Sequence, residues 1–599
     1  MNKLIGILIF IIVVIILAAG SLVSLLPTDE KVVPNKIEDL LPTPQQTPVS
    51  KAPVRQIDQA KLVDNLSIYP ELGEQPLEVI YVTVRKGNPS DRTDHSWYDI
   101  NHSSKASYDP KSEDPFPIAE AIVQVGDEVG PLPGKLGFAE SRTNATIQVR
   151  GNSSSKRPVK SFKIELRNWT TGWDGQYTIA LNKHAGDPTR IKNKLSYDLL
   201  IGAPDTISLR TRFVHMYVKD ETLNPPSEVF EDYGLFTQVE QPNKSFLRTH
   251  GLDPNAQFYK ATFFEFFTYP QQLKLVDDPD YDKAKFESVL EVKGSQDHRK
   301  LIQMLGDLND PLIPITTSFE NYFDADNYFS WMAFNILVGN LDTSSQNFYL
   351  YSPQNSQTWY FIPWDFDGAF SRLSKPQFGG NPPLNWEKGI QTYWGSPFHR
   401  KVLSEEKYRT LLDEKIEYWK EQLTEENLNK HISVYQPITL PFIQKMPDLL
   451  FSDLNEYDFV ISMFHEEIME NYRLYKQSLV EPMPFFVGEP QVNQNFIEFI
   501  WDSSYDFNHT DLEYHVQLSR TLDFTDILID EKVLNFTSLK TNLKLPAGTY
   551  FLKITVSNPD GKVQTSFDRY TDINNVIWQG VRSLIVEIDP NNFPTEAVP

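Results

Sequence analysis

The stretch that most constrains this chain spans residues 339–370, GNLDTSSQNFYLYSPQNSQTWYFIPWDFDGAF. It contains Asp342 and Asn347, with four residues between them, and then Asp365 and Asp367. Two aromatic-rich runs lie between these pairs, separated by SPQNSQ, which is typical of a turn. A hairpin there would return the later carboxylates to the first one. Carboxylate and amide oxygens at loop ends suit Mg²⁺, and a further Asp can act as a base.

Charge and composition exclude several classes of site. The 599 residues include 80 acidic and 56 basic side chains, a net charge of −24. This balance argues against nucleic acid as a main partner, because phosphate binding needs a basic surface. The chain has no cysteine, which excludes disulfides, thiolate zinc sites and cysteine nucleophiles. Its length predicts two or three domains.

The amino-terminal segment predicts a membrane anchor. Residues 4–26 are apolar and uncharged, and a helix of that length is about 35 Å long, enough to cross a bilayer. Lys3 before it favours an inside amino terminus, with the bulk of the chain extracytoplasmic. A cleaved signal peptide is the alternative. Residues 27–70 follow as a proline-rich linker.

The middle of the chain, residues 71–480, predicts a mixed α+β domain. Alternating apolar segments predict strands at residues 77–84, 118–125, 145–149, 161–166, 212–218 and 233–240. Asp187 and Pro188 suit the start of a helix over 187–200. After residue 247 the pattern favours helices, at residues 284–308, 326–338 (capped by Asp326 and ended by Gly339), 405–433 and 453–479.

The composition changes again near residue 481. From residue 496 short strands recur, separated by turn sequences such as Pro-Ala-Gly and Asn-Pro-Asp-Gly. We expect residues 490–590 to form an all-β sandwich with Trp501 in its core. This region resembles a fibronectin type III or immunoglobulin-like module.

The order Asp-x-x-x-x-Asn, two strands and then Asp is the order of a phosphoryl-transfer site. Such a site also needs cations for the phosphates. Lys163 lies within the predicted strand SFKIEL, on the face opposite Phe162 and Ile164. Arg150 and Lys160 flank the polar loop RGNSSSKRP, whose backbone N–H groups and hydroxyls are suited to phosphates. The alternative interpretation is that the acids are turn residues and that the bases form a solvated run of charges.

Several segments together resemble the CotH kinase family, the atypical protein kinases related to spore coat protein H. They occur in the family's order and cover roughly residues 77–479: RGNSSSKRPVKSFKIEL, IKNKLSYDLL, FVHMYV, YGLFTQVEQPNKSFL, NYFSWMAFNILVGNLDTSSQNFYLY and IPWDFDGAF. The resemblance implies a kinase-like two-lobed catalytic fold and Mg²⁺-ATP-dependent phosphorylation of protein Ser/Thr.

The resemblance also implies roles for individual residues. Asp342 matches the catalytic Asp, Asn347 the metal-binding Asn, and Asp365 and Asp367 the carboxylates of the Trp-Asp-x-Asp motif. Lys163 is the expected phosphate-binding lysine, with Lys160 second. The acid that pairs with such a lysine stays open; the sequence offers Asp198 and Glu240.

The leading hypothesis is a membrane-anchored, extracytoplasmic, atypical protein kinase of bacterial type that uses ATP and Mg²⁺. Its expected partner is a protein substrate of the cell surface or a coat, and not nucleic acid. One alternative is a non-catalytic cell-surface adhesin or assembly scaffold with a degenerate kinase-like domain. Another is a carbohydrate-active enzyme that uses two carboxylates.

Overall fold

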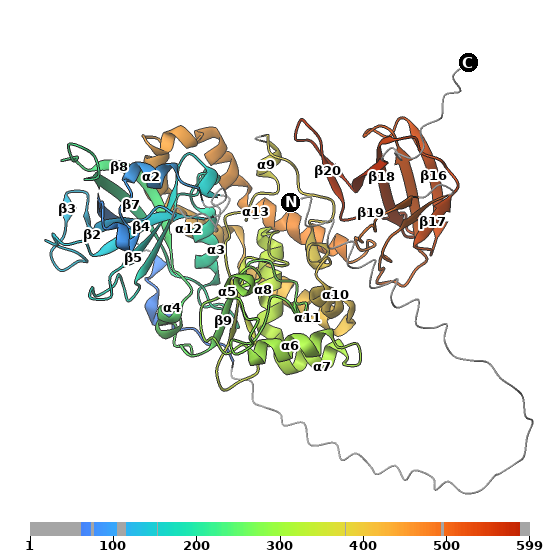
Figure 1. The fold of residues 1–599 in the computed structure, drawn as a ribbon, viewed down its shortest axis with the longest axis horizontal. Coiled ribbons are helices and arrows are strands. Elements are labelled where there is room, and N and C mark those ends of the chain that lie inside the picture. Colours follow the sequence, from blue (N-terminus) through green and yellow to red (C-terminus); the bar gives the residue numbers. More distant parts are fainter. Residues whose placement is uncertain are drawn as a thin grey trace, which may run out of the picture. The chain divides into compact units, whose positions relative to one another are not determined.

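The computed structural model describes residues 61–72, 77–104, 116–151, 154–377, 379–492 and 496–586. Within these ranges no helix is both long enough and apolar enough to cross a membrane. The predicted anchor, residues 4–26, and residues 27–60 of the predicted linker lie outside them. The described residues form a mixed α+β fold, with a large sheet, a helical part and a β-rich carboxy-terminal region (Figure 1).

The large sheet is closed on itself. β1 (Glu78–Arg85) pairs in parallel with β7 (Thr211–Asp220) and antiparallel with β2 (Ala119–Asp127), so it joins the two sides of the sheet. The order is β1-β7-β8-β6-β5-β4-β2, with β3 attached to β2. The remaining strands are β3 (Gly130–Pro131), β4 (Ala145–Arg150), β5 (Ser161–Leu166), β6 (Thr178–Asn182) and β8 (Glu231–Val239). The sequence predicted strands here, but not their closure into a ring.

The two faces of this ring have different roles. One face of each of the strands β1, β2 and β4 to β8 contributes to a single apolar cluster, on which Trp97 of α2 (Trp97–His102) packs against Phe162. The other face carries Arg150, Lys163 and Ala180 and receives the helices α3 (Lys192–Leu200) and α12 (Glu425–Ile443). Lys163 therefore lies on the face opposite Phe162, as its place in the strand predicts.

Helix α3 is buried on all sides, including its polar residues. It is shorter than the predicted helix over 187–200. The Asp187 side chain accepts hydrogen bonds from the backbone N–H groups of Thr189 (2.9 Å) and Lys192 (3.0 Å), so that regular helix begins only at Lys192. Charged residues inside such a helix need partners, and Lys194 and Asp198 form an ion pair of 2.9 Å.

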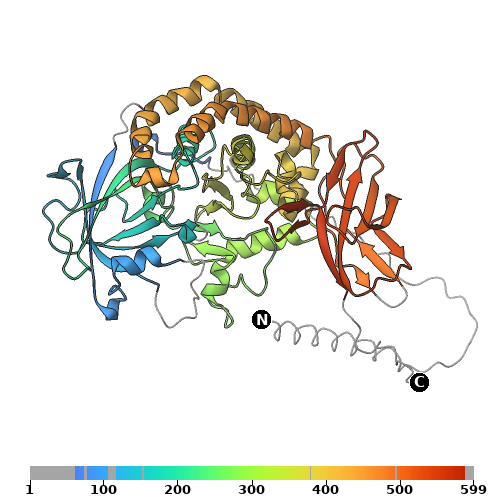
Figure 2. The ribbon, with the colours of Figure 1, turned by 90° about the horizontal axis from the view of Figure 1, so that it is seen from above.

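The helical part is built around a four-stranded sheet in the order β10-β9-β11-β12. Its strands are β9 (Gln257–Ala261), β10 (Leu290–Val292), β11 (Phe348–Ser352) and β12 (Tyr360–Pro363). The helices are α4 (Lys244–Thr249), α5 (Lys283–Glu287), α6 (Arg299–Asn309), α7 (Ile315–Tyr322), α8 (Ala325–Val338), α9 (Ser374–Gln377), α10 (Pro397–Ser404), α11 (Glu406–Gln422), α12 and α13 (Leu454–Ser478). α12 and α13 pack against each other (Figure 2).

Several predicted helix boundaries are wrong. The predicted helix over 284–308 is divided into α5, β10 and α6, because residues 290–292 pair with β9 instead. The predicted helix over 405–433 is two helices, since Thr424 caps α12 with its side chain. Asp324, not Asp326, caps α8, whereas Gly339 ends that helix as predicted, with φ of +69°.

The carboxy-terminal region consists of antiparallel sheets around one apolar core. Trp501 is 5% exposed and belongs to this core, as expected. The strands are β13 (Gln491–Val492), β14 (Ile497–Ile500), β15 (Glu513–Ser519), β16 (Ile527–Leu534), β17 (Ser538–Thr541), β18 (Gly548–Ser557), β19 (Val563–Thr565), β20 (Arg569–Thr571), β21 (Ile577–Gln579) and β22 (Val581–Val586). Residues 61–70, which we expected in the linker, include the buried Leu62 and the short 3₁₀ helix Leu66–Ile68.

Gly339 and Gly306 offer a matched test of the end of α8. A Cβ on Gly339 would lie 2.7 Å from Asn471 Nδ2, in a left-handed conformation, so Gly339→Ala should destabilise the fold by about 1–2 kcal/mol. Gly306 is exposed in α6 with open space around it, so Gly306→Ala should stabilise by about 0.5–1 kcal/mol. Urea unfolding of both variants measures the change in the free energy of unfolding. Equal and small changes in the two variants would contradict the conclusion that Gly339 needs a glycine.

Candidate functional site

The predicted hairpin in residues 339–370 is present. β11 and β12 are antiparallel, with Phe348 opposite Pro363. Asn347 directly precedes β11, and Asp365 follows two residues after β12 ends. The two residues therefore emerge at the same end of the hairpin, as the sequence predicted.

The loop after α8 is fixed by buried hydrogen bonds. The Asn340 amide donates to Asn335 Oδ1 (3.0 Å) and to the carbonyl of Asp365 (3.4 Å), which ties this loop to the second acidic loop. His399 Nε2 lies 3.1 Å from the carbonyl of Ser344, and the Tyr328 hydroxyl lies 2.7 Å from His399 Nδ1. Burial lowers the pKa of His399 to about 3, so the ring is neutral and donates from Nε2. The loop that carries Asp342 is thus held from both sides.

Asp342 is exposed at the surface of this loop. Asn347 Nδ2 lies 3.4 Å from its Oδ2, and the Gln346 amide also donates to this oxygen. Since the Asn347 nitrogen faces Asp342, its Oδ1 faces away from that carboxylate and suits a hard cation. Asn347 has φ of +59°, a left-handed conformation that Asn adopts more readily than most residues.

The loop with Asp365 lies between α3 and α8. The Asp365 N–H donates to the Tyr197 hydroxyl of α3 at 3.1 Å. Phe366 is fully buried and packs edge-on against Tyr197 and against Phe334 of α8. Asp365 has φ of +60°, so its conformation is sustained by these neighbours.

Electrostatics link the three carboxylates. Burial raises the pKa of the Asp365 carboxyl to about 7, with further increases from Asp367 and Asp342, while Arg150 and Lys260 lower it. The pKa of Asp365 therefore depends on the charges of two acids and two bases. A divalent cation would relieve the repulsion among the acids.

The predicted cations occupy different positions. Arg150, at the end of β4, donates to Asn182 Oδ1 and interacts with Asp365 and Asp367. Lys163 forms an ion pair of 2.6 Å with Glu165 and is about one-third exposed. Lys160 is buried, and its ammonium donates to the carbonyl of Ser155 at 2.6 Å within the basic loop. Arg150 is the predicted cation whose charge acts on Asp365.

The acid expected to pair with Lys163 is neither of the two candidates. Asp198 pairs with Lys194, and Glu240 pairs with Arg210 at 2.7 Å and with His250 at 2.9 Å. The acid that contacts Lys163 is Glu165 of its own strand. This exposed pair is weakly stabilising, because water screens it.

Three residues near the acids were not predicted. The Tyr197 hydroxyl accepts a hydrogen bond from the Asp365 N–H. Lys260 of β9 lowers the pKa of Asp365, and its Nζ lies 3.5 Å from Glu291 Oε1. His184 has a buried Nε2 without a hydrogen-bond partner among the described residues, and both Asp367 and Asp187 act on its charge. The sequence does contain a signal for Lys260, a single charge in the alternating run QFYKATF.

The residues fit a magnesium site shared with a substrate. The described part of the chain has no group of three or more His, Asp or Glu side chains placed to hold a metal ion. Mg²⁺ is commonly held by one or two carboxylates together with substrate phosphates, so a smaller set suffices. Asp365 and Asp367 with the Asn347 amide match that donor set.

Comparison with known proteins identifies the family. The family model described as CotH kinase protein matches residues 147–474, more than half of the chain. The chain belongs to the CotH kinase family. It is also 25% identical over 245 residues to the inner spore coat protein H of Bacillus subtilis (strain 168), an alignment that covers 40% of this chain and 63% of that protein. The chain thus matches less than two-thirds of this relative's length.

The CotH match begins in β4 and ends in α13. It therefore includes Arg150, the basic loop, α3 and both acidic loops, and it ends before the carboxy-terminal strands. β1 and β2, which close the sheet, precede it. The acids and the cations that act on them all lie within the family's part of the chain.

The raised pKa of Asp365 predicts how this CotH chain responds to pH. The pKa of the Asp365 carboxyl is higher in the folded protein than its ordinary value. Protonated Asp365 therefore stabilises the metal-free fold at low pH, and this stabilisation is lost as the pH rises through about 7. Mg²⁺ needs the ionised form, so its affinity should be about tenfold weaker at pH 6 than at pH 8. Calorimetric titration measures this, and Asp365→Asn should remove the dependence. Equal Mg²⁺ affinity at both pH values in the unsubstituted protein would contradict the assignment.

Proposed function

We propose that this chain is an atypical protein kinase of the CotH family, which transfers the γ-phosphate of ATP to Ser or Thr hydroxyls of proteins with Mg²⁺. The closed sheet and the helical part would be the two lobes of a kinase-like fold. The observation that carries the proposal is that Asp367 and Asp342 raise the pKa of Asp365, while Arg150 of the large sheet lowers it. Opposite charges from two structural parts thus meet at one place.

Each residue has a distinct task in this proposal. Asp342 is exposed, so an acceptor hydroxyl can reach it; Asp342 would orient that hydroxyl and take its proton. The bond from the acceptor oxygen to the γ-phosphorus forms as the bond from the β–γ bridging oxygen to this phosphorus breaks, and ADP leaves. Mg²⁺ held by Asn347, Asp365 and Asp367 would neutralise the phosphate charge.

The cations would bind the phosphates from the side of the sheet. Arg150 donates a hydrogen bond to Asn182 Oδ1, and the charges of Asp365 and Asp367 act on its guanidinium. The buried Nε2 of His184 has no hydrogen-bond partner among the residues that the structure describes, and Asp367 acts on the charge of this ring, so His184 offers a further polar group. Lys160 and Lys163 stay candidates on the same loop and strand. An unpartnered buried nitrogen is costly, which supports a ligand at this position.

The location of the proposed kinase follows from the sequence. The apolar segment 4–26 would anchor the chain in the cell membrane with its bulk outside. The substrate would then be a protein of the cell surface or of a coat. The relative's name, inner spore coat protein H, supports this class of substrate.

Phosphate transfer from labelled ATP tests the proposal. With Mg²⁺ and a Ser/Thr-rich acceptor protein, the unsubstituted chain should label the acceptor, and Asp342→Asn should reduce the rate at least about 100-fold, since it loses the base. Asp277→Asn is the matched control, because Asp277 is an exposed acid outside the site. Equal labelling by both variants would refute the role of Asp342. Nucleotide binding without any transfer would favour the scaffold alternative.

A further inference from the structure

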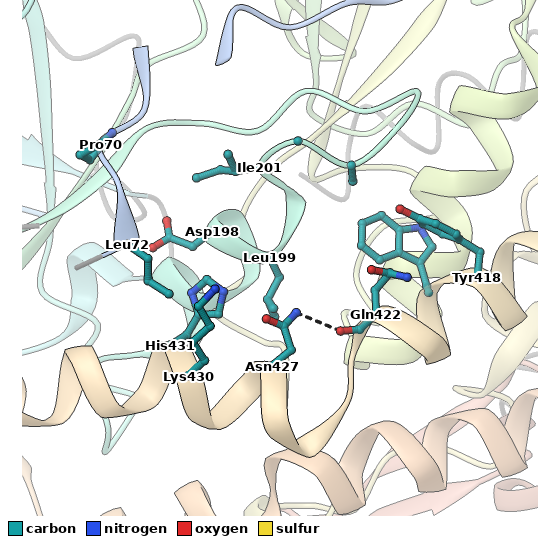
Figure 3. A pocket seen from close by; sticks show the side chains of 13 residues that line it. Pro70, Leu72, Asp198, Leu199, Ile201, Tyr418, Gln422, Asn427, Lys430 and His431 are labelled. Carbon is teal, nitrogen blue, oxygen red and sulfur yellow. Dashed lines mark hydrogen bonds between the residues drawn. The ribbon is translucent and has the colours of Figure 1, made fainter. Parts of the chain in front are cut away.

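A cavity of about 320 Å³ lies beside the carboxy-terminal end of α3, where Asp198 and Leu199 line it (Figure 3). It is bounded by the carboxy-terminal end of α3, the end of α11 and the beginning of α12. Two residues of the segment before β1 complete its wall. The polar lining groups come from Asp198, Tyr418, Gln422, Asn427, Lys430 and His431, and the apolar ones include Pro70, Leu72 and Leu199. Its volume is at the lower end of the range for small-molecule sites.

The charge in this cavity favours an anion. Asp198 is already committed, because it pairs with Lys194 at 2.9 Å and accepts hydrogen bonds from Thr211 Oγ1 at 3.1 Å and from the Tyr435 hydroxyl. Lys430 is exposed, and no ion pair joins it to another described residue within 4 Å. The positive charge of Lys430 is therefore available to a negatively charged ligand.

The hydrogen bonds of His431 favour a ligand that also carries a hydroxyl. Tyr435 uses its proton for Asp198, so the 3.1 Å contact between His431 Nδ1 and the Tyr435 oxygen requires the ring to donate from Nδ1. Burial lowers the pKa of His431, so the ring is neutral near pH 7. Its Nε2 is then a hydrogen-bond acceptor, and His431 and Lys430 both line the cavity.

We propose that this cavity binds a small hydroxylated oxyanion, a hydrogenphosphate group or a hydroxycarboxylate. Lys430 faces its negative charge, and His431 Nε2 accepts its hydroxyl proton. Sulfate has the same charge and size as hydrogenphosphate but no proton to donate near pH 7. It therefore separates the role of His431 from simple attraction to Lys430.

Occupancy of the cavity is coupled to the acidic site through α3. Asp198 and Leu199 line the cavity, whereas the preceding Tyr197 holds the Asp365 N–H at 3.1 Å. At the other end of the helix, Lys192 Nζ donates to Ser371 Oγ at 2.9 Å, in the segment that follows Asp367. A ligand that shifts α3 thus changes the geometry of Asp365. This second step rests on the proposed function, because it takes Asp365 as a metal ligand; coupling between two ligands is reciprocal.

Calorimetric titration of the full chain without nucleotide tests the binding step. Inorganic phosphate and malate should bind, and sulfate should bind at least tenfold more weakly than phosphate. Lys430→Ala and His431→Gln should each weaken phosphate binding at least tenfold. Lys283→Ala, which removes an equally charged and exposed side chain elsewhere, should leave it unchanged. Absence of binding, or phosphate binding that neither cavity variant affects, would overturn the proposal.

Titration of Mg²⁺ with and without saturating phosphate tests the coupling. We expect the Mg²⁺ affinity of the unsubstituted chain to change at least fivefold, and this change to vanish in His431→Gln. An unchanged affinity would refute the coupling while leaving the cavity site intact. Since neither titration uses ATP or measures turnover, a failure of the kinase proposal would be seen separately, in the transfer assay.

Discussion

The acidic site depends on offsetting the cost of a negative charge at Asp365, which burial raises first and the neighbouring carboxylates raise further. Asp365 lies near Asp367 and Asp342 in a half-buried position, and burial raises the cost of its charge. Arg150 and Lys260 offset part of this cost, and they come from two different sheets. The two sheets therefore have to keep a fixed position relative to each other for these charges to balance. In the proposed function a divalent cation would offset the repulsion among the acids, and Arg150 would offset the charge of the phosphates.

Helix α3 fixes this relative position. It is buried throughout, packs on β7 through its Lys194–Asp198 pair and Thr211, and reaches the second acidic loop through Tyr197 and Lys192. Buried ion pairs add little net stability, but they define one arrangement when all partners are present. The helix thus connects three regions that are far apart in the sequence. Its carboxy-terminal end lines the cavity, so the proposed coupling between that cavity and Asp365 would act through this helix.

The sequence predicted the hairpin well, because its signals are local. Asp342, Asn347 and the Trp-Asp-x-Asp run flank two aromatic strands, and the turn between them is strongly encoded. The end of α8 at Gly339 is also a local signal, and it was predicted correctly. The α+β class follows from the same patterns.

Long-range contacts could not be predicted in this way. The closure of the sheet depends on β1 pairing with both β2 and β7, and no pattern in β1 specifies two partners. Lys260 and Tyr197 act on the acidic site only through tertiary packing. A lone charge in an alternating run marks Lys260 as unusual, but no local pattern relates it or Tyr197 to Asp365. Residues 290–292 follow a helical pattern yet pair with β9, where tertiary pairing overrides propensity.

The central claim is that Asp365, Asp367 and Asn347 hold a divalent cation against phosphates bound from the side of Arg150. A crystal structure of the protein with Mn²⁺ and a non-hydrolysable ATP analogue tests it directly, through the anomalous signal of the metal. The account predicts a peak within about 2.5 Å of oxygens of Asp365 and of Asn347 or Asp367, with a phosphate oxygen in the same coordination shell. A metal bound elsewhere, or triphosphate that does not approach Arg150, would contradict it.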